Sequence, residues 1–271
     1  MDAQTHRLYR LDGAQVMGSM LNLSDNDLER LYTKTASYWR NSASKGEETY
    51  FSVVTEETWH RPLETEDKQV FLASGQAYIA IIRAYWERFC ARPSNTMTCM
   101  DFGCGVGRLA YWAAPYFEKI YGVDFSSPHL QEAKANLGAS QYGERFTGLL
   151  MNHLSDLSTL PAVDVCYSFI ALQHNTPPVI AKILAYLLQA LKPSGLALLH
   201  IPLAMPDYNF NFEQYMNDPH AGEDMEVHIL PKTDIHRIAE QYGCHILHSE
   251  CIGGVEAAYS ENIVFQKKSI G

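Results

Sequence analysis

The stretch MDFGCGVGR at residues 100–108, followed by YGVD at residues 121–124, decides how this chain folds. The first stretch is typical of a buried strand that enters a glycine turn and then a helix, and the second of the end of the next strand. Glycines let the backbone turn sharply and leave no side chains between the turn and a ligand. The helix directs free N–H groups and its positive dipole end toward that ligand. Because Asp124 can accept two hydrogen bonds from a ribose diol, the two stretches predict a pocket for an adenosine-bearing cofactor.

The spacing of the glycines separates three kinds of nucleotide site. A phosphate-binding P-loop needs Lys and then Ser or Thr after its last glycine, whereas here Arg108 and Leu109 follow. A dinucleotide-binding fold needs the pattern GxGxxG, whose third glycine would fall on Arg108. Asp101 precedes the turn, where a carboxylate repels a pyrophosphate and attracts an ammonium group. The pattern therefore favours a ligand with an amino-acid end.

Together with Asp124, the pattern DxGxGxG at residues 101–107 resembles the class I S-adenosylmethionine-dependent methyltransferases of the small-molecule type. The resemblance covers roughly residues 70–267, and it implies S-adenosylmethionine as the cofactor. The glycine turn would meet the amino-acid end, and polar groups after the third strand would lie near the adenine. The implied cofactor-binding residues are Asp101, Gly103, Cys104, Gly105, Gly107, Asp124, Phe125, Asn152, His153, Leu154, Ser168 and Phe169.

Strands and helices alternate through the core, which predicts an α/β fold with a doubly wound, mostly parallel sheet. The resemblance implies a Rossmann-like sheet of seven strands, in which the last two form a hairpin and the final strand is antiparallel. Helices are expected at 24–38, 69–92, 107–117, 127–136, 176–191 and 232–242. Strands are expected at 98–102, 120–123, 146–151, 163–169, 196–201, 245–251 and 262–266.

The sequence before the core is dense in aromatic residues. We expect residues 1–68 to form a helical N-terminal lid and residues 69–271 the cofactor-binding core, with 203–231 as a substrate-pocket insertion after the fifth strand. Aromatic faces attract a sulfonium by about 0.5–2 kcal/mol each, and a lid excludes water. The alternative is that these residues only cover the edge of the sheet. The lid interpretation predicts substrate contacts from Tyr32 and Tyr38, and it includes Trp39, Tyr50, Phe51 and Trp59 as further candidate residues of the lid.

Two histidines are candidate catalytic and substrate-binding residues. His174 lies where the resemblance places the transferred methyl group, and a neutral imidazole there could remove a proton from a hydroxyl or amine. The alternative is a helix-start histidine bonded to a backbone group. His228, at the end of the insertion, is the second candidate, with a surface histidine as its alternative. His200 is expected to be a satisfied core residue, and the spacing of the three resembles no metal motif, so no metal is expected.

Composition limits the partners and the compartment. The 271 residues carry a formal charge of −10 and 46% hydrophobic residues, and no cluster of Lys and Arg favours a nucleic acid partner. The six cysteines form no CxxC pair, which favours buried reduced thiols. No signal-peptide core or membrane-length apolar run is visible, so we expect a cytoplasmic protein without a membrane partner. The oligomeric state cannot be read, although an aromatic arm could pack on a neighbouring subunit.

These patterns predict an enzyme that methylates the oxygen or nitrogen of a small metabolite, with secondary metabolism as the expected setting. Ser168 is followed by Phe-Ile-Ala, whereas family members that methylate exocyclic amide or amine nitrogens carry Pro-Pro-aromatic there. One alternative is an S-adenosylmethionine-consuming enzyme that transfers or cyclises the amino-acid arm and releases methylthioadenosine. The other is a cofactor-binding partner protein without catalysis.

Overall fold

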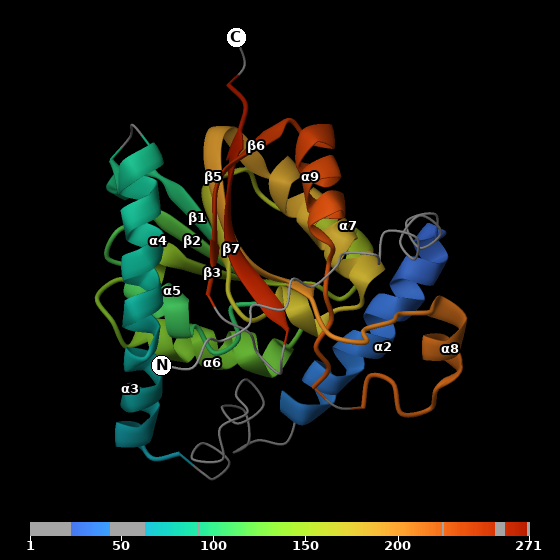
Figure 1. The fold of residues 1–271 in the computed structure, drawn as a ribbon. Coiled ribbons are helices and arrows are strands. Elements are labelled where there is room, and N and C mark those ends of the chain that lie inside the picture. Colours follow the sequence, from blue (N-terminus) through green and yellow to red (C-terminus); the bar gives the residue numbers. More distant parts are fainter. Residues whose placement is uncertain (1–22, 44–62, 91–92, 224, 253–257, 270–271) are drawn as a thin grey trace, which may run out of the picture.

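The computed structural model describes residues 23–43, 63–90, 93–223, 225–252 and 258–269. Within these residues a seven-stranded sheet has the order β3-β2-β1-β4-β5-β7-β6. The pairs among β1 to β5 are parallel, and β7 runs antiparallel to both β5 and β6. The predicted doubly wound, mostly parallel sheet is therefore confirmed (Figure 1). The strands are β1 (Thr98–Phe102), β2 (Lys119–Asp124), β3 (Phe146–Leu150), β4 (Val163–Ser168), β5 (Leu191–Ala204), β6 (Cys244–Cys251) and β7 (Tyr259–Lys267).

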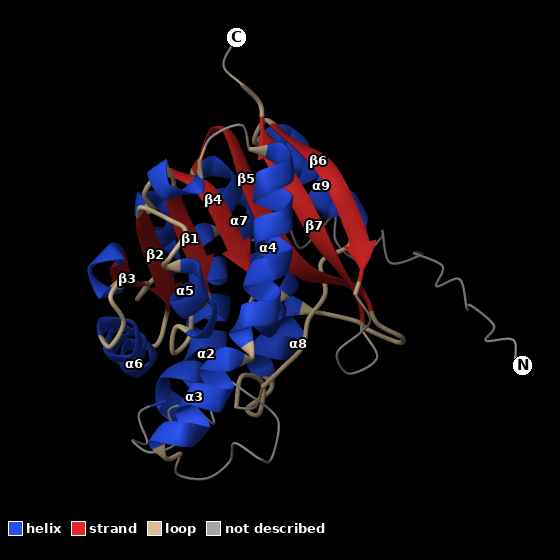
Figure 2. Ribbon diagram, turned by 90° about the vertical axis from the view of Figure 1, so that its left-hand side faces the viewer, coloured by secondary structure: helices blue, strands red, loops and turns tan. Residues whose placement is uncertain are grey.

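Helices cover both faces of the sheet. Figure 2 shows α4 and α5 in front of the strands and α7 and α9 behind them. Leu137 of α6 belongs to the buried cluster on the α4 and α5 side. The helices are α2 (Asp25–Ala43), α3 (Thr65–Ala73), α4 (Gly75–Phe89), α5 (Arg108–Ala113), α6 (Ser127–Gly138), α7 (Pro177–Gln189), α8 (Phe212–Asn217) and α9 (Lys232–Gln241).

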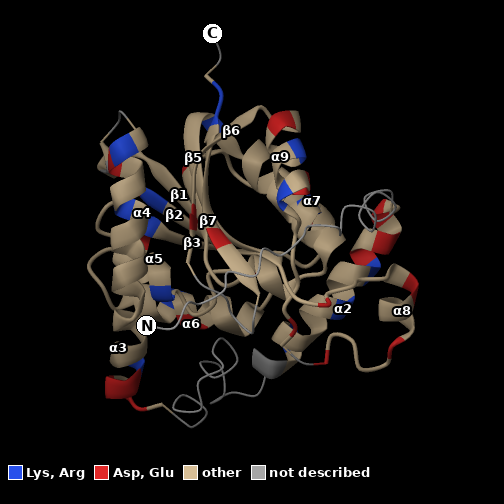
Figure 3. Cartoon of the chain, in the orientation of Figure 1, with Lys and Arg blue, Asp and Glu red and all other residues tan. Residues whose placement is uncertain are grey.

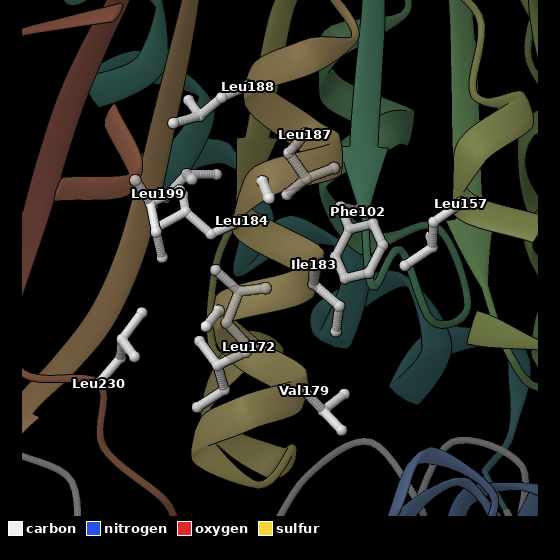
Figure 4. Close-up of a cluster of buried hydrophobic side chains, with 14 of the residues drawn as sticks. Phe102, Leu157, Leu172, Val179, Ile183, Leu184, Leu187, Leu188, Leu199 and Leu230 are labelled. Atoms are coloured by element: carbon white, nitrogen blue, oxygen red, sulfur yellow. The ribbon is translucent and has the colours of Figure 1, made fainter. Parts of the chain in front are cut away.

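The larger core lies between the sheet and α7. Val179, Ile183 and Leu187 recur every four residues along α7, and each is fully buried. This spacing places them on one face of the helix, where they pack toward Phe102 of β1 and its neighbours (Figure 4). Burying such side chains stabilises the fold by roughly 1.5–3 kcal/mol each. This core fixes the strands whose ends form the site.

The strand order reverses at β1, which pairs with β2 on one side and with β4 on the other. Asp101 accordingly lies between Gly122 and Tyr167 in the register of the three strands. In open α/β sheets, ligands bind beyond the carboxyl ends of the strands at such a reversal. Helices α2 and α8 lie beyond this end of the sheet (Figure 2), so they are placed to cover a ligand there.

Two expected elements differ from the structure. The single helix expected at 69–92 is two helices, α3 and α4, which meet at Ser74. A Cβ on Gly75 would lie 2.4 Å from the carbonyl oxygen of Arg108, so α4 begins at a glycine where it touches the start of α5. Strand β5 begins at Leu191 rather than 196 and takes in the expected turn as an irregularity, with Ser194 at a φ of 64°.

The proposed lid is described only in part. Helix α2 runs five residues beyond the expected end, and Ser24 Oγ accepts a hydrogen bond from the backbone N–H of Asp27 at 3.2 Å, as expected of an N-cap. The proposed boundary at residue 68 falls inside α3, which begins at Thr65. Residues 1–22 and 44–62, with Tyr50, Phe51 and Trp59, lie outside the described residues.

The cysteines and the charged residues agree with the expectations from composition. All six cysteines are free, and four of them are buried: Cys99, Cys104, Cys166 and Cys244. Lys and Arg residues are spread over several elements of the described chain (Figure 3). None of the helices in the described ranges combines the length and the apolar character needed to cross a membrane.

Candidate active site

The turn after β1 requires glycine at two positions for steric reasons. Gly103 has a φ of 71°, and a Cβ there would lie 2.3 Å from the Cβ of Ala171. Gly107 has a φ of 82°, and its Cβ would lie 2.8 Å from Leu137 Cδ1. L-residues with side chains rarely adopt these angles. The turn thus has no side chains at Gly103 and Gly107, and at Gly103 its backbone packs closely against Ala171 in the loop that follows β4.

Asp124 ties the turn after β1 to the turn after β2. Its Oδ2 accepts a hydrogen bond from the backbone N–H of Gly105 at 2.9 Å, and its Oδ1 accepts one from Ser126 N–H at 2.9 Å. The residue is only 8% exposed. Because each carboxylate oxygen can accept two hydrogen bonds, Asp124 can shape the turn and still accept two hydroxyl groups.

Asp101 lies at the base of the same turn, and one of its carboxyl oxygens lacks a hydrogen-bond partner. It is 3% exposed, and its Oδ2 has no hydrogen-bond partner. Burial raises the pKa of Asp101 to about 7, although the Tyr167 hydroxyl and the positive charge of Arg108 oppose this rise. A buried polar group without a partner is costly. An ammonium group above the turn would give this carboxyl the partner it lacks.

The loop after β3 is shaped by two carboxylates. Asp156 Oδ2 accepts hydrogen bonds from the backbone N–H groups of Asn152 and His153, both at 2.9 Å. Glu29 of α2 accepts a hydrogen bond from Leu154 N–H at 2.9 Å, and its Oε1 lies 3.0 Å from His153 Nδ1. The side chain of His153 is 67% exposed, as expected for a solvent-facing loop residue. Asp156 therefore organises this loop through its backbone.

Helix α2 clamps the loops that follow β2 and β3. Tyr32 Oη donates a hydrogen bond to Met151 O at 2.7 Å, and the Tyr32 ring packs edge-on against Phe125 at 5.4 Å. Arg40 donates to the carbonyl oxygens of Asn152 and Met151 at 2.7 and 3.3 Å. Tyr32 is fully buried, so it acts in this structure as a packing residue. Its proposed contact with substrate remains a prediction.

Tyr38, the other residue of the proposed lid, packs edge-on against Trp39 with 5.0 Å between the ring centres. The Trp39 ring lies 5.0 Å from the ring of His174. Helix α2 therefore reaches the loop after β4 as well as the loops after β2 and β3.

The loop after β4 starts with a strained residue. Ser168 Oγ donates a hydrogen bond to Phe102 O at 2.9 Å, and the Phe169 ring packs edge-on against Tyr78. Ile170 has a φ of 55°, an unusual angle for a β-branched residue. Its N–H donates a hydrogen bond to His200 Nδ1 at 3.3 Å. His200 is buried as expected, and it also holds the turn in which this strain is stored.

His174 combines features of both interpretations of its role. Its Nδ1 lies 2.8 Å from the carbonyl oxygen of Glu226, so Nδ1 carries the hydrogen and Nε2 carries the lone pair. Burial lowers the pKa of His174 to about 4, and the hydrogen bond that Nδ1 donates to Glu226 O only partly opposes this. The ring is therefore neutral at pH 7. Its Nε2 lone pair lies 3.5 Å from Gln173 Nε2, which donates to it in this structure, and it could accept a proton or a hydrogen bond from an acceptor in place of this long contact.

His228 is not a surface residue, so that alternative is wrong. It is 7% exposed, and its backbone N–H donates a hydrogen bond to Gln173 O at 2.7 Å. Its Nε2 lies 2.8 Å from Glu226 Oε2 and its Nδ1 lies 2.7 Å from Tyr208 Oη. The insertion thus folds back onto the loop after β4 and brings His228 to the same end of the sheet as His174.

Sequence analysis missed the residues that join distant segments. Glu29 and Arg40 contact loops more than 80 residues away in the sequence, and no local pattern marks such a contact. Tyr208 and Glu226 stand in an insertion without periodicity, and their only signal was the density of polar and aromatic residues around His228. In the part of the chain that the structure describes, no group of three His, Cys, Asp or Glu residues could hold a metal ion.

Known proteins share this architecture. Residues 99–195 match the family model of a methyltransferase domain, and no curated protein sequence matches the chain. The magnesium protoporphyrin IX methyltransferase of Synechocystis PCC 6803, solved with bound S-adenosylhomocysteine, is 18% identical, with a TM-score of 0.59 over 86% of this chain and 100% of that one. The geranyl diphosphate C-methyltransferase of Streptomyces coelicolor A3(2) is 12% identical, with a TM-score of 0.57 over 88% and 98% of the two chains.

A third solved structure with the same fold is described by another reaction. The (4+2)-cyclase SpnF is 14% identical, with a TM-score of 0.53 over 70% of this chain and 81% of that one. The shared fold, the glycine turn with its two carboxylates and the matched domain model agree for the core of the chain. Residues 99–195 match a methyltransferase domain, and the described residues share the fold of methyltransferases solved with bound S-adenosylmethionine or S-adenosylhomocysteine.

Proposed function

We propose that this protein binds S-adenosylmethionine and transfers its methyl group to an oxygen or nitrogen atom of a small metabolite. The observation that supports this most directly is the glycine turn between Asp101 and Asp124. A Cβ at Gly103 would meet Ala171 at 2.3 Å, and Asp101 Oδ2 lacks a partner although it is buried. The residues present therefore fit a ligand with an ammonium group at one end and a ribose diol at the other.

Each part of this ligand has a set of residues to hold it. Asp101 and the backbone of Gly103 and Gly105 would hold the amino-acid end, and Asp124 would accept hydrogen bonds from the ribose hydroxyls. Phe125 and the loop at 152–154 would hold the adenine. When bound, the cofactor supplies an activated methyl group, which is why little further catalytic machinery is needed. The chain orients the acceptor and excludes water from the site.

The acceptor side of the site is formed by the loops after β4 and β5. His174 and His228 lie there together, and each is less than a tenth exposed. We propose that one of them accepts the acceptor's proton. Relatives of the same fold act on a porphyrin and on geranyl diphosphate, the latter at carbon, so the fold alone does not fix the acceptor atom. The setting, cytoplasmic secondary metabolism, is part of the proposal and rests on the sequence alone.

One experiment separates this function from its alternatives. The purified protein is incubated with S-adenosylmethionine alone and then with a panel of phenols, alcohols, carboxylic acids and amines, and the products are identified by mass spectrometry. Methyl transfer predicts S-adenosylhomocysteine and a methylated product only when an acceptor is present. Methylthioadenosine formed without an acceptor would instead indicate cyclisation of the amino-acid arm. Tight binding without any product would favour the non-catalytic alternative.

A further inference from the structure

We propose that Tyr208, His228 and Glu226 form a proton relay, in which Tyr208 takes the proton from a neutral hydroxyl group of the acceptor. The acceptor class is then an alcohol or a phenol, methylated on oxygen. This inference rests on the proposed function, because it names the acceptor of that reaction. It assigns the contact with the acceptor to Tyr208, a residue of the loop after β5.

The relay ends at Glu226, which three hydrogen bonds hold in place. Its Oε1 accepts a hydrogen bond from Gly222 N–H at 2.7 Å, and its Oε2 accepts one from Tyr215 Oη at 2.7 Å. The third comes from His228 Nε2 at 2.8 Å. Burial alone would raise the pKa of Glu226, but these hydrogen bonds hold it below its usual value. Glu226 is therefore an ionised carboxylate at neutral pH.

An ionised carboxylate fixes the direction of the hydrogen bond between Glu226 and His228. Because Glu226 can only accept, His228 Nε2 must donate. The proposed relay takes the ring in its neutral form, whose lone pair then lies on Nδ1. Tyr208 Oη lies 2.7 Å from this Nδ1, so the tyrosine hydroxyl donates to it. Tyr208 Oη also accepts a hydrogen bond from the backbone N–H of Ile229, so one lone pair is left to accept a proton from outside the relay. A base oriented by a third group is the general arrangement for activating a hydroxyl group.

The relay lies at the carboxyl ends of the strands, on the acceptor side. The carbonyl oxygen of Glu226 is bonded to His174 Nδ1 at 2.8 Å, and His228 N–H is bonded to Gln173 O at 2.7 Å. Both partners belong to the 3-10 turn Leu172–His174 after β4. Tyr208 follows β5 by four residues. The relay is thus joined to the loop at which the resemblance places the methyl group.

Aromatic packing holds the imidazole of the relay in one orientation. The rings of Tyr208, Phe210 and Tyr215 lie 6.0, 6.0 and 5.9 Å from the ring of His228, each nearly perpendicular to it. A side chain locked by such packing keeps its hydrogen bonds aligned, as a catalytic group requires. His228 has both ring nitrogens engaged within this enclosure, so its proton can leave only along the relay.

The proposed step conserves atoms and charge. The acceptor's O–H bond breaks as its proton passes to Tyr208 Oη, while the proton of Tyr208 passes to His228 Nδ1. The new O–CH₃ bond forms as the C–S bond of the sulfonium methyl donor breaks, and that electron pair stays on sulfur. The positive charge of the sulfonium is thereby moved to the imidazolium of His228, beside the Glu226 carboxylate. A carboxylate or a thiolate acceptor has no such proton to lose and does not need the relay.

The test compares Tyr208→Phe with the unchanged chain on acceptors that differ in protonation. Phenol, catechol and 4-hydroxybenzoate are the neutral hydroxyl probes, and thiophenol, which is ionised at pH 8, is the comparator. Loss of a general base lowers kcat by about 100-fold or more, so we expect this loss for the hydroxyl probes alone. The KM values and the dissociation constant of S-adenosylmethionine should change by less than about threefold. Tyr116→Phe, which removes a hydroxyl bonded to Arg83 outside the site, should leave all rates unchanged.

The proton positions are measured independently of turnover. Nitrogen NMR of the full chain with labelled histidine, assigned with His228→Gln, should show the hydrogen of His228 on Nε2. A hydrogen on Nδ1, equal slowing of phenol and thiophenol by Tyr208→Phe, or turnover of benzoate without any hydroxyl probe would overturn the relay. Absence of S-adenosylhomocysteine with every probe would contradict the proposed function, and the NMR result would then decide on the relay by itself.

Discussion

The two sides of the site are built in different ways. On the cofactor side, Gly103, Gly107 and Asp124 lie within 22 residues of one another, and their geometry follows from backbone angles and from hydrogen bonds across two adjacent turns. On the acceptor side, His174 and His228 meet only because the insertion after β5 folds back onto the loop after β4. The first side is specified locally, and the second depends on contacts between distant segments.

This difference also sets the charge of each side. Asp101 is a buried carboxyl group whose pKa burial raises to about 7, so it gains stability from a positively charged neighbour. His174 and His200 are buried imidazoles whose pKa values burial lowers to about 4, so they stay neutral at pH 7. A cationic cofactor is therefore favoured near Asp101, and proton acceptance is favoured on the acceptor side.

The largest expected effect comes from the local side. Gly103→Val places a β-branched side chain at a φ of 71°, where even a Cβ would lie 2.3 Å from Ala171. We expect the binding of S-adenosylmethionine to weaken by more than about 100-fold, or the thermal midpoint to fall steeply. Calorimetry and thermal unfolding measure the two outcomes. Gly138→Ala is the matched control, because a Cβ there meets nothing within 4 Å; normal binding by Gly103→Val would show that the turn tolerates side chains.

The second prediction compares how the buried groups of the two sides make the stability of the fold depend on pH. The folded-state pKa of His174 and of His200 lies below the ordinary 6.5, so the unfolded chain binds more protons and both histidines lose stability as pH falls from 6.5 toward 4. Asp101 has the opposite sign, because its folded-state pKa is raised, so it loses stability as pH rises from 3.8 to about 7. In the unchanged chain the contribution of Asp101 offsets part of the contribution of the two histidines.

Asp101→Asn removes one of these opposing contributions. We expect the free energy of unfolding of this variant to fall between pH 7 and pH 5 by on the order of 2 kcal/mol more than that of the unchanged chain, because the variant lacks the opposing contribution of Asp101. Urea unfolding at the two pH values measures the difference, since all other carboxylates are common to both chains. Identical pH profiles for the two chains would mean that Asp101 is ionised in the folded protein and that burial does not raise its pKa.

Features that depend on local sequence were predicted, and features that depend on contacts between distant segments were not. The glycine turn, the mostly parallel sheet and the positions of Asp101 and Asp124 were predicted, because short-range sterics and the alternation of strands and helices determine them. The buried position of His228 was not, because it depends on hydrogen bonds to Tyr208 and Glu226 in a segment without periodicity. Helix 69–92 was predicted as one helix, whereas the structure divides it at Ser74, beside a contact between Gly75 and Arg108 that no local pattern marks.

The third prediction concerns Asp124. Asp124→Ala removes the acceptor for Gly105 N–H and Ser126 N–H as well as the proposed acceptor for the ribose. We expect S-adenosylmethionine to bind at least about tenfold more weakly in calorimetry. Asp164→Ala is the matched control: that carboxylate accepts hydrogen bonds from Thr98 and Lys192 at the opposite end of the sheet. It should lower stability without changing affinity, and equal affinity losses in the two variants would remove Asp124 from the binding site.

The smallest expected effect tests the link between the two sides, which is α2. Arg40→Lys keeps the charge but cannot span the carbonyl oxygens of Phe125, Met151 and Asn152 together, which the guanidinium of Arg40 contacts at 3.4, 3.3 and 2.7 Å. We expect the affinity for S-adenosylmethionine to fall by about threefold to tenfold, mainly through faster dissociation, because the loops after β2 and β3 lose a shared anchor. Stopped-flow release of the cofactor measures this rate. Arg30→Lys, on the same helix but paired with Asp27 and half exposed, should release the cofactor at the unchanged rate. If both variants release it equally fast, the contacts of Arg40 do not anchor the two loops that hold the cofactor.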